Sequence, residues 1–85
     1  MLTKTSHPAG ASTHLLSAVS SGKMVELTAI DGGRRLRKRL ADLGLSVGQQ
    51  IRVVQNHFAG PLILAVQHDT RLAIGRGMAK KIYVR

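Results

Sequence analysis

The residues that could bind a metal ion are four histidines and four acids, spread over the whole chain. His68 and Asp69 are adjacent in an expected turn, and His57 would lie near them if the two strands around it pair as a hairpin. Zinc requires three or four ligands that converge at about 2 Å, and neighbouring residues in a turn rarely converge on one ion. We therefore expect no dedicated metal site within the chain. His57, His68 and Asp69 are retained only as candidates for an opportunistic site that bridges two molecules.

Catalytic chemistry has little support in the residue types present. The chain has no cysteine, and its acids, Glu26, Asp31, Asp42 and Asp69, include no pair close in sequence. No Gly-x-Ser-x-Gly motif marks a serine nucleophile. A chain of 85 residues forms one domain at most, and so small a core leaves little room for a cleft that excludes water. We therefore expect a protein that is not an enzyme and that uses no cofactor.

Positive charge is the strongest chemical signal. The chain has 13 Lys and Arg residues against 4 Asp and Glu residues, a formal net charge of +9. One cluster, offset only by Asp42, places five basic residues within six positions: Arg34, Arg35, Arg37, Lys38 and Arg39. Such a cluster attracts an acidic protein surface, nucleic acid or anionic lipid. We interpret it as a docking face for an acidic partner, where complementary charge mainly speeds association. A merely solvated helix face and contact with nucleic acid are the alternatives.

The strands that must position these residues are short. Alternating apolar and polar residues predict five of them, at residues 23–30, 50–56, 62–67, 70–74 and 80–85. In the first strand, Val25, Leu27 and Ala29 are expected to face the core. Residues 75–79 are expected to form a tight turn rather than a phosphate-binding loop, because the glycine spacing of such a loop is absent. Residues 1–12 are polar and aperiodic and predict a flexible tail. Residues 14–19 predict a helical turn that tucks Leu15, Leu16 and Val19 against the body.

The basic cluster lies on a predicted helix at residues 34–43. Leu36, Leu40 and Leu43 form one apolar stripe of this helix, and Asp31 is a candidate for its N-terminal cap. Gly44 is expected to end the helix in a left-handed conformation, with Leu45 packed against Leu40. In the turn at residues 46–49, Gly48 occupies the position where a type II turn needs a positive φ.

Five strands with one short helix after the first strand predict a mostly β protein, a small closed or partly closed barrel of the SH3-like or OB-like type. Periodicity alone does not separate these two barrels. The longest apolar run, residues 62–66, is far shorter than the ~20 residues that span a bilayer. The N-terminus also lacks the apolar stretch of a secretory signal. The absence of cysteine is compatible with a reducing cytosol.

The two aromatic residues, Phe58 and Tyr83, bear on the kind of partner. Proteins that bind single-stranded nucleic acid usually stack bases on aromatic side chains, and this chain has almost none. Phe58 lies in the expected loop at residues 57–61, where an exposed aromatic could anchor an interface. The alternative is that Phe58 folds back over the mouth of the barrel.

The order and spacing of four stretches resemble the FeoA family, the small accessory proteins of bacterial ferrous iron uptake. The resemblance covers residues 13–85. It is carried by Val25–Gly33, which ends in Ile30-Asp31-Gly32-Gly33, by Leu40-Ala41-Asp42-Leu43-Gly44-Leu45, by Val47-Gly48 before Ile51-Arg52-Val53, and by Arg71-Leu72-Ala73-Ile74-Gly75 through Met78-Ala79 to Ile82-Tyr83-Val84. Val47 stands where the family commonly has Pro, which weakens that turn slightly.

This resemblance implies an SH3-like barrel with a helical insertion. It also implies a non-enzymatic, cytoplasmic role beside FeoB, a membrane transporter with a cytoplasmic GTP-binding domain. On this view the partner contacts are Arg34, Arg35, Arg37, Lys38, Arg39 and Phe58, and contact with a membrane is only indirect, through the transporter. The link with a transition metal does not require this chain to bind iron. The alternative function is a small basic barrel that binds nucleic acid. A weak homodimer would need anions or metal ions to bridge its like-charged faces.

Overall fold

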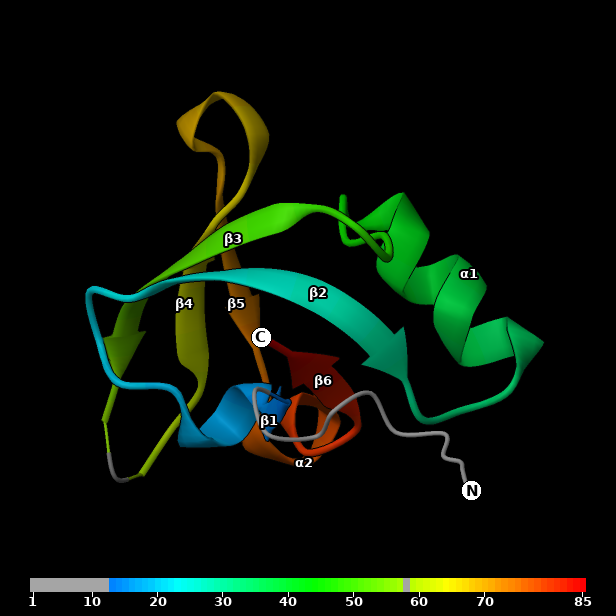
Figure 1. Cartoon of the computed structure of the whole chain (residues 1–85), viewed down its shortest axis with the longest axis horizontal. Helices are drawn as coiled ribbons and strands as arrows, with labels where there is room; N and C mark the ends of the chain where they lie inside the picture. Colours follow the sequence, from blue (N-terminus) through cyan, green and yellow to red (C-terminus); the bar gives the residue numbers. More distant parts are fainter. Residues whose placement is uncertain (1–12, 58) are drawn as a thin grey trace, which may run out of the picture.

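The computed structural model describes residues 13–57 and 59–85, which form a curved antiparallel sheet flanked by helices (Figure 1). In this part of the chain the sheet has six strands in the order β1-β6-β2-β3-β4-β5. The strands are β1 (His14–Leu15), β2 (Met24–Ile30), β3 (Gln50–Asn56), β4 (Leu62–Ala65), β5 (Arg71–Ile74) and β6 (Ile82–Val84). The order ends in β1 and β5, which do not pair with each other, so the sheet is open. The mostly β class is confirmed, whereas the predicted five-stranded barrel, closed or partly closed, differs from the six-stranded open sheet observed.

The additional strand is β1, within the segment expected to be only a helical turn. His14 pairs with Val84 and Leu15 with Tyr83, both on β6. The helical turn follows directly as the 3₁₀ helix η2 (Leu16–Ala18), which buries Leu16. Two residues are too few to show an alternating pattern, so a strand this short depends on a partner 70 positions away in the sequence. This is why periodicity did not reveal it.

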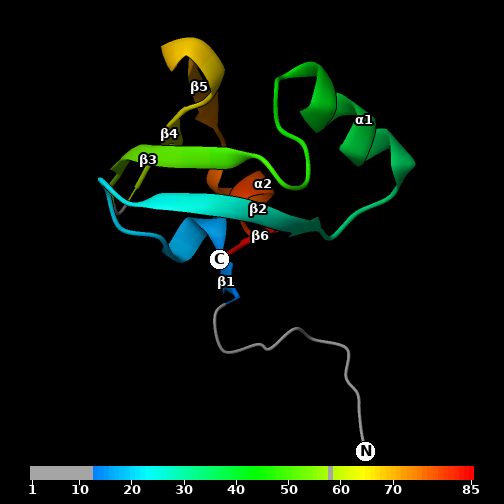
Figure 2. The same cartoon turned by 45° about the horizontal axis from the view of Figure 1, so that its top comes forward.

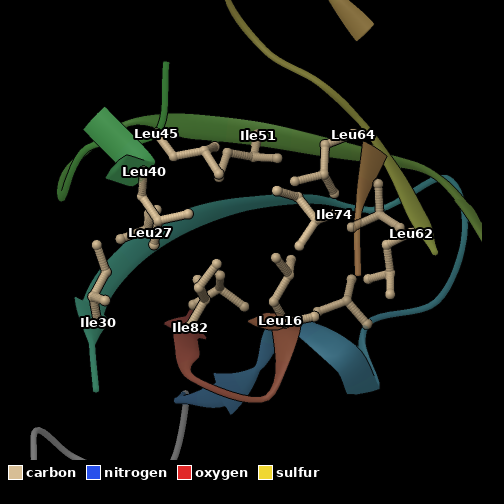
Figure 3. Packing of buried hydrophobic residues seen from close by; sticks show 14 residues of the cluster. Leu16, Leu27, Ile30, Leu40, Leu45, Ile51, Leu62, Leu64, Ile74 and Ile82 are labelled. Carbon is tan, nitrogen blue, oxygen red and sulfur yellow. The ribbon is translucent and has the colours of Figure 1, made fainter. Parts of the chain in front are cut away.

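The core lies on the concave face of the sheet and is entirely apolar among the residues described (Figure 3). Its strand residues follow the expected alternation on β3, β4 and β6. On β2, however, Leu27 and Ile30 are buried and Ala29 is exposed. The pairing of β2 with β6 shifts register between Leu27 and Ala29, and such an irregularity reverses which side chains face inward. The expectation that Ala29 faces the core is therefore wrong.

The helix α1 (Arg34–Asp42) stands out from one end of the sheet (Figures 1 and 2). Its N-cap is Gly33, with no side-chain hydrogen bond, so the expected cap by Asp31 is wrong. Leu40 is fully buried and Leu36 packs against the core, but Leu43 is 41% exposed. Leu43 is the C-cap residue, where the helical stripe has ended. The expected three-leucine stripe therefore has two members.

The exit from α1 fixes the helix to the sheet at its C-terminal end. Gly44 has φ +97°, the Leu45 N–H donates to the Leu40 carbonyl at 2.8 Å, and the Gly44 N–H donates to the Ala41 carbonyl at 2.9 Å. These are the two hydrogen bonds of a Schellman motif, as expected. Leu40 and Leu45 lie together at one end of the core, near Leu27 (Figure 3). Gly48, with φ +95°, forms the expected turn before β3.

Two further short helices shape the ends of the sheet. The hairpin between β4 and β5 contains the 3₁₀ helix η3 (Gln67–Asp69), in which His68 has φ 56°. This hairpin begins earlier than predicted, because β4 ends at Ala65. The expected turn before β6 is a short α-helix, α2 (Arg76–Ala79), which buries Ala79.

Candidate docking face

The basic cluster lies on α1, and each of its side chains is exposed: Arg34, Arg35, Arg37, Lys38 and Arg39. These five residues are called the α1 face below. Helical spacing distributes them over most of the circumference that Leu36 and Leu40 do not occupy. Because Leu40 and Leu45 hold the C-terminal end of α1 against the core, the cations project from a fixed helix rather than from a loop. The cluster predicted from the sequence is thus brought together on one element.

The cations of the α1 face make no ion pair with any side chain that the structure describes. Glu26 pairs instead with Arg85, whose Nη2 lies 3.2 Å from Glu26 Oε1. Asp31 and Asp42 flank α1 in sequence and are both exposed. The positive charge of α1 is therefore little compensated inside the molecule and is directed to solvent.

The charge pattern of α1 also works against the helix itself. The first turn contains no acid, and Gly33 supplies no side-chain cap. Cations near a helix N-terminus and an acid near its C-terminus oppose the helix dipole, at about 0.3–1 kcal/mol each. Arg34 with Lys38, and Arg35 with Arg39, are like charges at i and i+4, which cost about 0.2–0.5 kcal/mol a pair. Departures from local stability rules of this kind are expected where a segment serves binding.

Arg76, on α2, provides a contrast because its guanidinium is engaged inside the fold. Its Nη2 donates to Asn56 Oδ1 at 2.8 Å and to the His57 carbonyl. Asn56 Nδ2 in turn donates to the Ser17 and Val19 carbonyls at 3.1 and 2.7 Å. The glycines beside Arg76 thus belong to the start of the short helix α2, where the sequence predicted a tight turn, and not to a phosphate-binding loop.

The metal-ligand candidates are not brought together. Asn56 pairs with Leu62 at one end of β4, whereas η3 follows the other end, so His57 and His68 lie at opposite ends of that strand. The expectation that the hairpin would place them close is wrong. Within the described residues, no group of three or more His, Cys, Asp or Glu side chains could hold a metal ion. A site that bridges two molecules stays a prediction. Phe58, the other predicted contact, lies outside the described residues.

Sequence reasoning passed over a second set of surface residues. Met24 is 53% exposed and Val47 is 62% exposed, and both lie on the side of the sheet opposite the core, near the exit of α1. The sequence does indicate that both side chains are exposed, since the alternation in its strand points Met24 outward and Val47 occupies a turn. An isolated exposed apolar residue is common, however, and only the fold shows that these two are neighbours.

Comparisons with known proteins place the chain among iron-transport proteins. The family model of the FeoA domain matches residues 14–85. A protein of Methanocaldococcus jannaschii that carries the name Fe(2+) transport protein A is 35% identical over 69 residues, which are 81% of this chain and 82% of that protein. The crystal structure of an iron uptake regulatory protein (FeoA) superposes with a TM-score of 0.79 at 36% identity and covers 86% of this chain and 96% of that one.

A more distant similarity concerns the fold alone. A manganese-dependent transcriptional repressor matches with a TM-score of 0.75 at 24% identity, over 86% of this chain and 41% of the repressor.

No helix in the described part of the present chain is long and apolar enough to cross a membrane.

Proposed function

Because the chain belongs to the FeoA domain family, we propose that it is a non-enzymatic accessory protein of ferrous iron uptake that binds the cytoplasmic part of a FeoB-type GTP-binding transporter. Family membership supports the role in ferrous iron transport. The choice of partner and of contact surface is our inference from the α1 face. The proposal also places the chain in the cytoplasm, where the GTP-binding domain of such a transporter lies.

The observation that carries the proposal is the set of unpaired cations on α1. Five exposed cations share one short helix, and the described acids do not neutralise them. An acidic partner surface would remove the like-charge repulsion within α1 and would also satisfy the positive end of the helix dipole. Charge complementarity of this kind raises the association rate and selects the partner more than it raises affinity. Binding through α1 would modulate the assembly of the transporter or its nucleotide-dependent cycle.

A second contact in this proposal is Phe58, as an apolar complement to the charged helix. The Arg76 hydrogen bonds to Asn56 and His57 fix the chain immediately before that residue. Association of the chain with itself is the weaker alternative, because two surfaces of this charge repel each other unless anions or metal ions bridge them.

Calorimetric titration tests the proposal. The purified chain is titrated into the soluble GTP-binding domain of its cognate ferrous transporter, with and without guanine nucleotide, at low and at physiological salt. We expect saturable binding that persists at physiological salt, and dependence on nucleotide would identify regulation of the GTPase cycle. A DNA duplex is titrated in parallel. Salt-sensitive binding to DNA with no binding to the transporter domain would replace the proposal by the nucleic-acid alternative.

A further inference from the structure

A hollow of about 700 Å³ lies on the outer face of the sheet, between the exit of α1 and the β4–β5 hairpin. Both views of the molecule show α1 and the tip of that hairpin rising on the same side, with β3 running between them (Figures 1 and 2). The lining side chains that matter most to the chemistry of this hollow are Met24, Val47, Gln49, Arg52 and Val66. This hollow is called the outer groove below.

The floor of the outer groove is a row of residues set by strand pairing. Met24 on β2 pairs with Arg52 on β3, and Arg52 pairs with Ala65 on β4. The flanking residues Ile51 and Leu64 are buried in the core, so this row faces away from the core. The floor is therefore held by backbone hydrogen bonds of three strands, and a ligand would meet a preformed surface.

The outer groove carries apolar side chains among polar ones. Val47 is 62% exposed at the tip of the turn after α1, Met24 is 53% exposed on the floor, and Val66 is half-buried at the start of the hairpin. Gly44 lies next to Val66, since a Cβ atom on Gly44 would stand 3.9 Å from Val66 Cγ2. The groove is thus continuous with the C-terminal end of the helix that bears the α1 face.

The charge of the outer groove favours an anionic ligand. Among the lining residues that the structure describes, Arg52 is the one charged residue and none is an acid. Arg52 is exposed and makes no ion pair with a described side chain. Gln49 Oε1 accepts a hydrogen bond from the Ser46 N–H at 3.2 Å. Gln49 Nε2 is buried and has no acceptor in the described part of the chain. Buried donors of this kind normally have a partner, and this nitrogen would meet a ligand only after the Gln49 side chain turns toward the groove.

We propose that the outer groove binds an extended, acidic segment of the protein partner, with an apolar side chain on Met24, Val47 and Val66 and a carboxylate on Arg52. A hollow of about 700 Å³ falls in the range that accommodates a few side chains. The lining residues in the described part of the chain include no aromatic side chain on which a base could stack, so the groove favours peptide over nucleic acid. This inference rests on the proposed function, because the segment belongs to the same transporter whose acidic surface meets the α1 face.

The test compares groove variants with matched controls in the same titration against the transporter GTP-binding domain. Val47→Asp and Arg52→Glu place negative charge in the groove, and we expect each to weaken binding by about tenfold or more. Ala73→Asp and Lys23→Glu make the same changes in charge at exposed positions that do not line the groove, and binding should change by less than about threefold. All these sites are exposed, so circular dichroism should show the same fold.

Two outcomes separate this inference from the proposed function. If the wild-type chain binds the transporter domain and the groove variants bind equally well, the groove inference is wrong and the proposed function stands. If the wild-type chain does not bind at all, the proposed function fails, and NMR of the ¹⁵N-labelled chain decides the groove. The probe is then a short peptide with blocked ends that contains one leucine among glutamates and aspartates. The control is the same peptide with serine in place of leucine.

With the leucine peptide, we expect the Gln49 side-chain amide signals to shift, and the serine peptide should have a much weaker effect. That result would support an acidic-peptide groove for a different protein partner. No shift with the leucine peptide would overturn the inference. A shift with single-stranded DNA and none with either peptide would overturn it as well.

Discussion

The two α-helices begin alike and use arginine differently. Both α1 and α2 are preceded by a glycine N-cap that makes no side-chain hydrogen bond, and both have arginine as their first residue. Arg76 of α2 is half-buried and donates to Asn56 and the His57 carbonyl. Arg34 of α1 is exposed and makes no ion pair with a described side chain. A cation that donates hydrogen bonds inside the fold, as Arg76 does through Nη2, serves stability, whereas a cation directed to solvent is available to a partner.

The largest effect should come from the attachment of α1 to the sheet. Leu40→Ala removes a fully buried side chain and should lower the free energy of unfolding by about 2–5 kcal/mol. Leu43→Ala, three residues along the same helix but 41% exposed, should cost less than about 1 kcal/mol. Urea denaturation measures both values. Equal losses would mean that α1 is not held at Leu40, and the comparison of the two helices would lose its structural basis.

An intermediate effect should follow from truncating arginine on each helix. Arg76→Ala deprives Asn56 Oδ1 and the His57 carbonyl of a charged donor and should cost about 1–2 kcal/mol. Arg37→Ala removes an exposed cation of the α1 face and should change stability by no more than about 0.5 kcal/mol. Thermal or urea unfolding of the pair is the measurement. A loss at Arg37 as large as that at Arg76 would show that the α1 cations are structural after all.

The smallest effect has the opposite sign. Arg34→Glu places an acid in the first turn of α1 and converts the repulsive pair with Lys38 into an attractive one. Stability should therefore rise by about 0.5–1 kcal/mol, while binding to the transporter domain weakens. Arg34→Gln, which only removes the charge, should give a smaller gain. A loss of stability in Arg34→Glu would contradict the view that α1 gives up helix stability for positive potential.

Local patterns in the sequence predicted most of the elements and the helix exit, because those features depend on neighbouring residues. The left-handed Gly44 and the contact of Leu45 with Leu40 followed from their spacing alone. Features that depend on segments distant in the sequence could not be predicted from local patterns. The strand β1 requires β6, the irregularity in β2 exchanges Ala29 for Ile30 in the core, and the open sheet is a property of all the strands.

The candidate site divides in the same way. The α1 face could be predicted because its five cations lie within six positions of one helix. The internal use of Arg76 depends on Asn56, 20 positions away, and the outer groove gathers residues from β2, β3, β4 and two turns. No single run of adjacent residues marks either feature, since the groove joins residues 46–50 to Met24, Arg52 and residues 65–67. Their recognition requires the pairing register, which the sequence alone does not provide.

The most direct test of the α1 face is the affinity of the double variant Arg35→Glu/Lys38→Glu for the transporter GTP-binding domain. The control, Lys23→Glu/Lys80→Glu, makes the same change in net charge at exposed positions outside the α1 face and the outer groove. We predict that the α1 variant binds about tenfold or more weakly at physiological salt with its unfolding midpoint unchanged, and that the control loses less than about threefold. Equal affinities of the two variants would contradict the account, because the partner would then respond to overall charge or dock elsewhere.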